Sequence, residues 1–197
     1  MPSTVQSPSD FDVELRRLIL REGITALTMG EMASRLRCSR RRLYEFAPSK
    51  EDLLLKVAGD MFLSVRQNGW AAARRHETSS GKFAAYLRAG IPMVRETTDA
   101  FYADMDALPA GRRLFDSHQR ERIAGLEQLI AEGIRSGEFA RFHARVVAEI
   151  VLSGARRIRE PNFSAQTGAT FEEAFSELSR LVRDGLRKRS PQREKSR

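Results

Sequence analysis

Apolar residues recur along most of the chain every three or four positions, which is the spacing of one face of an α-helix. No segment alternates apolar and polar residues as a half-buried strand does. The first apolar stripe consists of Phe11, Leu15, Leu18 and Ile19. It predicts a helix that starts at Ser9 or Asp10 and stops at Gly23. The same spacing predicts later helices over residues 82–96, 97–108, 110–136, 139–159 and 171–188, with a loop around 161–170. The chain is therefore predicted to be all-α.

Two short helices lie between the first stripe and a longer helix. Thr28 followed three residues later by Glu31 has the form of a capping box, in which each side chain bonds to the other's backbone. After a short break, Ser39 caps a second helix, and Pro48 ends it. Ser49 then opens a long helix rich in apolar residues. Residues 28–46 therefore have the spacing of a helix-turn-helix.

Arginines gather at the turn and at the start of the second short helix. The eight residues 35–42 contain five arginines and no acidic residue. Cations in the first turn of a helix oppose its dipole, and each costs about 0.3–1 kcal/mol. A phosphate or a guanine base would compensate, since Arg pairs with either through two hydrogen bonds. In a helix-turn-helix the second helix enters the DNA major groove, so this segment is interpreted as a recognition helix. The alternative is a solvated charged face.

Three motifs in this region resemble those of the DNA-binding domain of TetR/AcrR-family transcriptional regulators. They are Thr28-Met29-Gly30-Glu31-Met32-Ala33, Ser39 with Leu43-Tyr44, and Pro48-Ser49-Lys50-Glu51-Asp52-Leu53. The resemblance covers about residues 10–60. It implies a DNA-contacting set of Thr28, Ser39, Arg40, Arg41, Arg42, Tyr44 and Lys50. In that set the arginines divide base and phosphate contacts, and the others meet phosphates. For Tyr44, packing between helices is the competing interpretation.

The chain departs from the family pattern at three places. Arg37 stands where the family usually has Gly, and a left-handed backbone there would cost about 1–2 kcal/mol. Arg42 replaces a small residue or Thr, and Phe46-Ala47 replaces a His-Phe pair. These departures affect contact positions, so they bear on the operator sequence rather than on the domain assignment.

The resemblance implies two domains with short ends. We expect a flexible tail over 1–9, a three-helix DNA-binding domain over 10–57, a helical ligand-binding and dimerisation domain over 58–188, and a basic tail over 189–197. Bundles bind small molecules between their helices. The candidates to line such a pocket are Met61, Phe62, Phe83, Tyr86, Met93, Phe101, Tyr102, Met105, Phe115 and His118. At helical spacing the same residues also serve as core.

Two late stripes are candidates for a subunit interface. TetR-like proteins pair their last two long helices with those of a second subunit, which implies a four-helix contact. The candidates are Val147, Ile150, Val151, Gly154, Phe175, Leu178, Leu181 and Val182. Packing within one chain is the alternative. A two-fold dimer would present its recognition helices about 34–36 Å apart on one face of DNA.

Composition narrows the function classes. The 197 residues carry 34 Lys and Arg against 26 Asp and Glu, a net charge of +8 that favours a polyanionic partner. A single cysteine, Cys38, excludes an internal disulfide and any site with several cysteines. A redox role for it would require a lowered thiol pKa. We expect no signal peptide, no membrane span, no metal site, no cofactor and no catalytic constellation.

These observations predict a cytoplasmic, homodimeric, sequence-specific DNA-binding regulator, a repressor released from a palindromic operator by an apolar or amphipathic small molecule. The first alternative is a helix-turn-helix regulator without a small-molecule effector, controlled by a protein partner or by its own concentration. A helical enzyme and a membrane-surface protein using the basic tail are the remaining alternatives. Effector, operator and target genes cannot be derived from the sequence.

Overall fold

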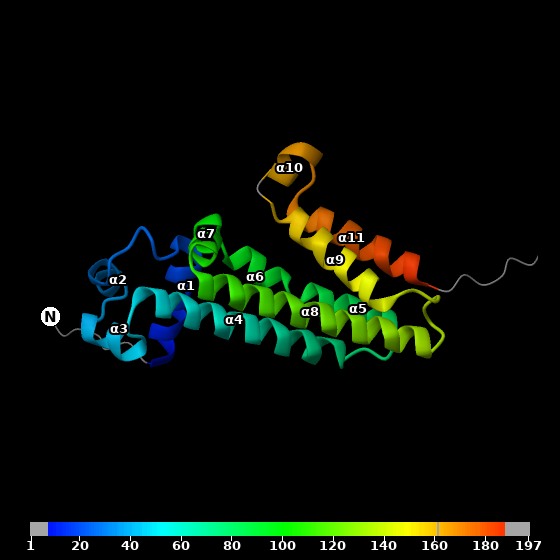
Figure 1. The fold of residues 1–197 in the computed structure, drawn as a ribbon, viewed down its shortest axis with the longest axis horizontal. Coiled ribbons are helices and arrows are strands. Elements are labelled where there is room, and N and C mark those ends of the chain that lie inside the picture. The colour runs from blue at the N-terminus through cyan, green and yellow to red at the C-terminus, as the bar shows by residue number, and fades with distance from the viewer. Residues whose placement is uncertain (1–7, 161, 188–197) are drawn as a thin grey trace, which may run out of the picture. The chain divides into compact units, whose positions relative to one another are not determined.

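The structure is a computed structural model that describes residues 8–160 and 162–187. Within these residues it contains helices and no strand (Figure 1). The helices are α1 (Pro8–Glu22), α2 (Met29–Arg35), α3 (Arg40–Phe46), α4 (Lys50–Ala73), α5 (Ser79–Arg88), α6 (Ile91–Glu96), α7 (Asp99–Ala107), α8 (Pro109–Arg135), α9 (Ala144–Ile158), α10 (Asn162–Thr167) and α11 (Phe171–Leu186). The predicted all-α class is confirmed.

The described residues divide into two compact units. The first unit contains residues 8–65 and 91–118, and the second contains 66–90, 119–160 and 162–187. Helices α4 and α8 each begin in the first unit and end in the second. The predicted domain boundary at residue 57 lies inside α4, and it stays a prediction.

The first unit has a core that α1–α4 share with α6 and α7. Leu15, Ile19, Met32 and Leu43 are completely or almost completely buried in it, together with Phe101. Each of the short helices α2 and α3 contributes one or two buried residues, so packing against α1 and α4 stabilises them more than their own seven-residue length does.

The loop between α1 and α2 is held by α7. The carboxylate of Asp104 is buried and accepts hydrogen bonds from the backbone N–H groups of Ile24 and Thr25 and from the Thr25 hydroxyl. Gly23 has a left-handed backbone with φ +69°, and any Cβ there would overlap the Asp104 carboxylate. At the start of α7, Thr98 donates from its N–H to the Leu20 carbonyl at 3.1 Å. These bonds connect residues almost 80 positions apart.

The second unit contains an antiparallel pair, α9 and α11, whose helices lie side by side (Figure 1). At their contact, a Cβ on Gly154 would lie 3.4 Å from Leu178, so these two residues pack closely within the chain. The capping box of Thr170 and Glu173 starts α11. Glu138 accepts from the N–H groups of Ser79 and Ser80, at 2.6 and 2.9 Å, and so holds the first turn of α5.

Three element boundaries differ from the sequence prediction. Residues 82–96 lie in two helices, because a continued α5 would need an N–H at residue 92 to donate to the Arg88 carbonyl, and Pro92 has none. Helix α9 starts at Ala144 rather than 139, because the buried Phe139 pairs with Arg187 in an isolated bridge and packs against Gly133. Residues 162–167 form the short helix α10 where a loop was predicted.

The predicted tails lie mostly outside the described residues. Helix α1 begins at Pro8, inside the predicted N-terminal tail of residues 1–9. The predicted basic tail over 189–197 lies wholly outside the described residues.

Candidate nucleic-acid interface

Both short helices of the candidate interface begin with the predicted caps. Thr28 accepts a hydrogen bond from the Glu31 N–H at 3.2 Å, and Glu31 accepts from the Thr28 N–H at 2.8 Å, which completes the capping box. These bonds from Thr28 lower the pKa of the Glu31 carboxyl, because they stabilise its ionised form. Ser39 accepts from the Arg42 N–H at 3.2 Å. In this bond the Ser39 hydroxyl is the acceptor, so its own proton is not used.

The turn between α2 and α3 is strained at one residue. Arg37 has φ +50° and is the one non-glycine residue with a positive φ among those the structure describes. A left-handed conformation is therefore present where the family usually has Gly. The next residue, Cys38, donates its N–H to the Ala33 carbonyl at 2.9 Å and is half-buried. Burial raises the pKa of the Cys38 thiol, which argues against a reactive thiolate there.

The three arginines that open α3 lie in different surroundings. Arg40 is exposed, and its guanidinium rests against α2 at Gly30, where a Cβ would collide with it. Arg41 is exposed and pairs with Glu45 at 2.8 Å. Arg42 is half-buried, with its guanidinium 4.5 Å from the centre of the Phe11 ring of α1. Arg40 and Arg41 are thus available at the surface, whereas Arg42 packs against α1.

The other predicted DNA-contacting side chains lie around α3. Tyr44 is 52% exposed, so its ring does not fill the core. Thr28 is exposed, but its hydroxyl already donates to Glu31 at 2.8 Å. Lys50, at the start of α4, donates from Nζ to the Ile24 carbonyl at 3.2 Å. Lys50 and Asp104 therefore hold the two sides of the same residue, Ile24.

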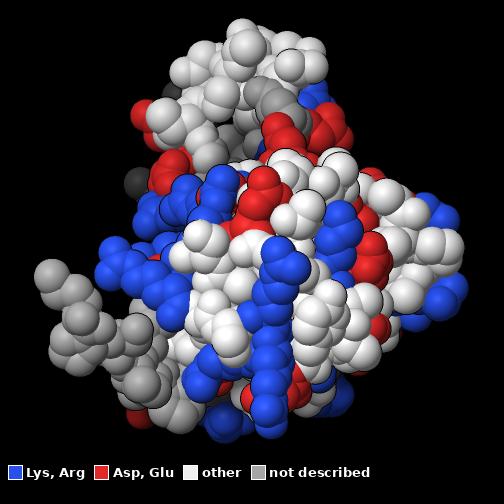
Figure 2. Space-filling view, turned by 90° about the vertical axis from the view of Figure 1, so that its left-hand side faces the viewer, with Lys and Arg blue, Asp and Glu red and all other residues white. Residues whose placement is uncertain are grey.

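The surface view from this end of the molecule shows Lys and Arg side chains in several groups, with Asp and Glu between them (Figure 2). Part of the arginine charge is neutralised locally, because Arg35 pairs with Glu22 and Arg17 pairs with Glu14. Such exposed pairs contribute little to stability and exchange readily for other partners. Arg17 and Arg35 are therefore not committed to these partners.

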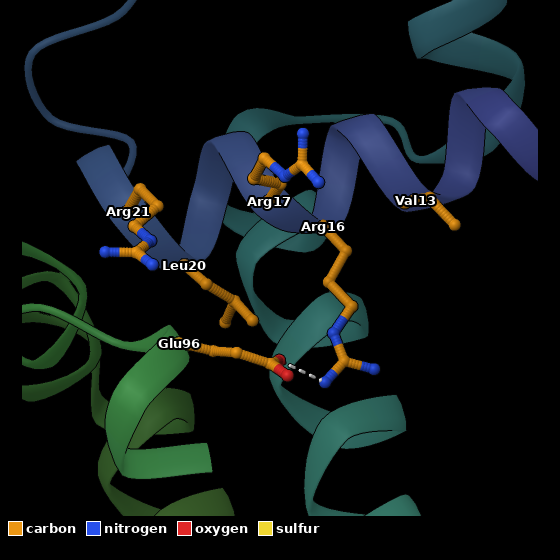
Figure 3. Close-up of a pocket in the computed structure, with 6 residues that line it drawn as sticks. All are labelled: Val13, Arg16, Arg17, Leu20, Arg21 and Glu96. Atoms are coloured by element: carbon orange, nitrogen blue, oxygen red, sulfur yellow. Dashed lines mark hydrogen bonds and ion pairs between the residues drawn. The ribbon is translucent and has the colours of Figure 1, made fainter. Parts of the chain in front are cut away.

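A surface groove of about 450 Å³ runs along α1 beside α6 (Figure 3). Its lining residues are Val13, Arg16, Arg17, Leu20, Arg21 and Glu96. Arg16 reaches across it to Glu96 at 2.6 Å (Figure 3). None of the predicted pocket residues lines this groove.

Most predicted pocket residues are buried and in contact with one another. In the first unit Phe62 stacks on His118, with ring centres 4.3 Å apart, and also contacts Phe115. Phe101 and Tyr102 meet edge to face, while Met61, Met93 and Met105 belong to the same core. In the second unit Phe83 and Tyr86 are fully buried. The structure thus gives all of these residues packing contacts, and their role as ligand contacts stays a prediction.

One buried polar cluster of the second unit was not predicted from the sequence. Arg122 of α8 is 4% exposed and donates to the carbonyls of Tyr86 and Leu87, at 3.0 and 3.1 Å. Its guanidinium lies 4.6 Å from the centre of the Tyr86 ring, and Trp70 of α4 packs against the same ring. Burial lowers the pKa of Arg122 and raises that of Tyr86, because it disfavours both charged forms. The sequence signal was an arginine on the apolar stripe of residues 115–129.

The candidate interface residues of α9 and α11 fall into two groups. Val151 and Phe175 are buried within their own chain, and Gly154 contacts Leu178. Gly154 and Leu178 are partly exposed, so internal packing fully covers only Val151 and Phe175. The role of all four as subunit contacts stays a prediction. Ile150 and Leu181 are exposed, at 63% and 73%, and Val147 and Val182 are partly exposed. Val146 of α9 and Phe142, which lies just before this helix, are also exposed large apolar residues.

Among the residues that the structure describes, no three His, Cys, Asp or Glu side chains are grouped so that they could hold a metal ion. None of the described helices is both long enough and apolar enough to cross a membrane.

Comparison with known proteins gives matches among solved structures. A scan against models of protein families finds no match, and a search of curated proteins finds none either. A putative transcriptional regulator from Saccharomonospora viridis, in complex with choline, superposes with a TM-score of 0.79. It is 16% identical, over 92% of this chain and 97% of the other.

Two other solved structures agree with this match. The TetR-family transcriptional regulator PfmR from Thermus thermophilus has a TM-score of 0.67 and 17% identity, over 91% of this chain and 99% of its own. The transcriptional regulator FadR from Bacillus subtilis, in complex with stearoyl-CoA, has a TM-score of 0.71 and 13% identity, over 91% and 100%. The resemblance seen in the sequence is confirmed in the fold, which is that of TetR-family transcriptional regulators.

Proposed function

We propose that the chain is a cytoplasmic, homodimeric regulator of transcription that binds a palindromic operator through α3. The observation that carries this proposal is the exposure of Arg40 and Arg41 at the N-terminus of α3. This helix is the second of a helix-turn-helix whose two helices both begin with a side-chain cap, at Thr28 and at Ser39. Both arginines oppose the dipole of α3, and among the described residues only Arg41 has an acidic partner, the exposed Glu45. A DNA backbone and guanine bases supply partners to both arginines.

The individual contacts are proposed from the surroundings of each side chain. Arg40, held against Gly30, is the candidate for a base edge because its guanidinium is already positioned. Arg41, Tyr44 and Ser39 are the candidates for phosphates, since all three are exposed. Arg42 is a weaker candidate for DNA contact, because its guanidinium packs on the Phe11 ring.

Lys50 and Thr28 complete the proposed contact set. The Lys50 ammonium has three N–H donors, so it can keep its bond to the Ile24 carbonyl and also meet a phosphate. The Thr28 hydroxyl must leave the Glu31 carboxylate before it can donate to DNA.

The exposed apolar residues of α9 and α11 support a dimer. Val146, Ile150 and Leu181 are each at least half exposed, and large apolar side chains grouped on a surface mark a protein interface. A two-fold axis through this face would bring the two copies of α9 and α11 together. We also propose release of DNA by a small molecule, which is supported by neighbours of this fold that hold choline or stearoyl-CoA.

The proposal is tested by selecting bound duplexes from a random DNA pool with the full-length protein at moderate salt. We expect enrichment of one inverted repeat with half-sites about 10 base pairs apart, because a two-fold dimer places its recognition helices one helical turn apart. Binding that is salt-sensitive but selects no sequence would contradict the proposal. An Arg40→Ala/Arg41→Ala protein serves as the control and is expected to enrich nothing.

A further inference from the structure

The buried pair Arg122 and Tyr86 has hydrogen-bonding groups that the protein does not use. A guanidinium has five N–H donors, and two of those of Arg122 reach carbonyls. The Tyr86 hydroxyl is buried, and among residues 8–160 and 162–187 no acceptor receives its proton. Buried polar groups are nearly always paired, so a hydroxyl proton without an acceptor, beside a guanidinium with spare donors, points to an absent acceptor.

The charge of Arg122 is also uncompensated. Within the described part of the chain no carboxylate pairs with its guanidinium, and Glu121 pairs instead with Arg66. The two carbonyls that Arg122 contacts belong to the last turn of α5. They supply about half an elementary charge at most. A buried cation without a full counter-charge is costly, and an anion would remove that cost.

Three glycines lie next to this pair: Gly69 and Gly125 beside Tyr86, and Gly90 beside Nη2 of Arg122. A Cβ on Gly69 would lie 3.1 Å from the Tyr86 ring, and one on Gly125 would collide with the Tyr86 hydroxyl, so both sides are closed by close packing. A Cβ on Gly90 would lie 3.5 Å from Nη2 of Arg122, an ordinary contact distance. Gly90 is partly exposed, and residue 90 has no side chain that would cover Nη2 on this side.

An aromatic surface lies beside the same groups. The Trp70 ring is 4.9 Å from that of Tyr86 and is partly exposed. A ligand whose oxygens accept from Arg122 and Tyr86 would therefore place its remaining atoms near apolar rings. A planar carboxylate suits a guanidinium because two of its oxygens can accept two parallel N–H bonds.

We propose that Arg122, Tyr86, Gly90 and Trp70 form a binding site for a small carboxylate with an apolar or aromatic body. This inference rests on the proposed function, in which such a molecule is the effector. It assigns a chemical class to that effector: an organic anion rather than a neutral or cationic molecule.

The test is calorimetric titration of the full-length protein, without DNA, with octanoate and benzoate. Octanamide and benzamide serve as neutral counterparts of the same shape, and inorganic phosphate serves as a second anion. We expect saturable binding of at least one carboxylate at one site per subunit. Its amide counterpart and phosphate should bind about tenfold more weakly or worse. No binding of either carboxylate would overturn the proposal, as would equal binding of an amide or of phosphate.

Three variants locate the site. Arg122→Gln and Tyr86→Phe should each weaken carboxylate binding, the first by about tenfold or more. Arg122→Gln also removes bonds to the end of α5, so its fold must be checked by circular dichroism. Gly90→Ala avoids that difficulty, since its methyl group fits at ordinary distance but covers Nη2.

The matched control is Gly59→Ala, whose Cβ would meet nothing within 4 Å and which should bind as the unmodified protein does. Undiminished carboxylate binding by Gly90→Ala and by a folded Arg122→Gln would overturn the assignment. Because these titrations contain no DNA, their outcome is independent of the operator selection. Failure of this site and failure of the regulator proposal are thus distinguishable.

Discussion

Replacing Asp104 tests how the helix-turn-helix is held to the rest of its unit. The carboxylate is 7% exposed and accepts three hydrogen bonds from the loop between α1 and α2, two of them from backbone N–H groups. In Asp104→Ala both N–H groups lose their acceptor. The Ile24 N–H is buried, and leaving it unpaired costs about 1–3 kcal/mol. The lost bonds to the part-buried Thr25 add about 1 kcal/mol, so we expect a loss of about 2–4 kcal/mol in the free energy of unfolding.

Two milder changes at the same place separate charge from geometry. In Asp104→Asn the amide oxygen can still accept from Ile24 and Thr25, while the amide nitrogen donates to the Thr25 hydroxyl. We therefore expect a smaller loss, about 1–1.5 kcal/mol, which comes from the missing charge. Thr25→Val removes one hydroxyl donor and leaves both backbone bonds, so it should cost about 1 kcal/mol.

The assay is urea unfolding followed by circular dichroism at one fixed protein concentration, because association contributes to the measured stability. The expected order of destabilisation is Asp104→Ala well above Asp104→Asn, which is close to Thr25→Val. Equal losses for Asp104→Ala and Thr25→Val would refute the reasoning, since they would mean that the two backbone bonds contribute nothing. Because the loop leads directly into α2, Asp104→Ala should also weaken operator binding.

Three further predictions follow from other parts of the structure. Arg37→Gly should stabilise the protein by about 1 kcal/mol, because relief of the left-handed backbone strain exceeds the entropy that glycine adds to the unfolded chain. Arg37→Ala keeps the strain and should bring no gain. Equal effects of the two substitutions in urea unfolding would contradict this prediction. Leu181→Glu should convert dimers to monomers in sedimentation, whereas Leu63→Glu, also at an exposed leucine, should not; a dimeric Leu181→Glu protein would count against the proposed interface. Because the pKa of Glu31 is lowered from 4.5, its contribution to stability is present above pH 4.5 and lost as the pH falls through the lowered pKa. The difference in stability between the unmodified protein and Glu31→Gln should therefore vanish at acid pH, and a difference independent of pH would contradict it.

Local signals in the sequence were sufficient for the helix-turn-helix. Thr28 with Glu31, and Ser39, specify helix starts through bonds to residues three positions away, so no knowledge of the tertiary fold is needed. The left-handed Arg37 was foreseeable only from the family resemblance, which implies a Gly at this position of the turn. Reasoning from local signals failed at Phe139, whose burial against Gly133 is a tertiary contact that helical spacing does not reveal.

The surroundings of individual side chains could not be predicted. Arg42 was assigned to DNA with its neighbours, yet its guanidinium lies on Phe11, a residue 31 positions earlier. Lys50 and Asp104 meet at Ile24 although they are 54 positions apart. The role of Arg122 was not predicted, because the sequence does not show whether a charged residue within an apolar stripe is buried. Long-range contacts of this kind depend on the whole fold.

In the proposed complex the first turn of α3 reads DNA bases. The most direct test is competition binding between the selected operator and versions of it with single base-pair changes. The unmodified protein should discriminate at each half-site position. Arg40→Ala should lose about 1–3 kcal/mol of discrimination at one position and keep it elsewhere. Arg17→Ala, an exposed arginine on α1, should discriminate as the unmodified protein does. An Arg40→Ala protein with an unchanged pattern of discrimination would contradict the claim.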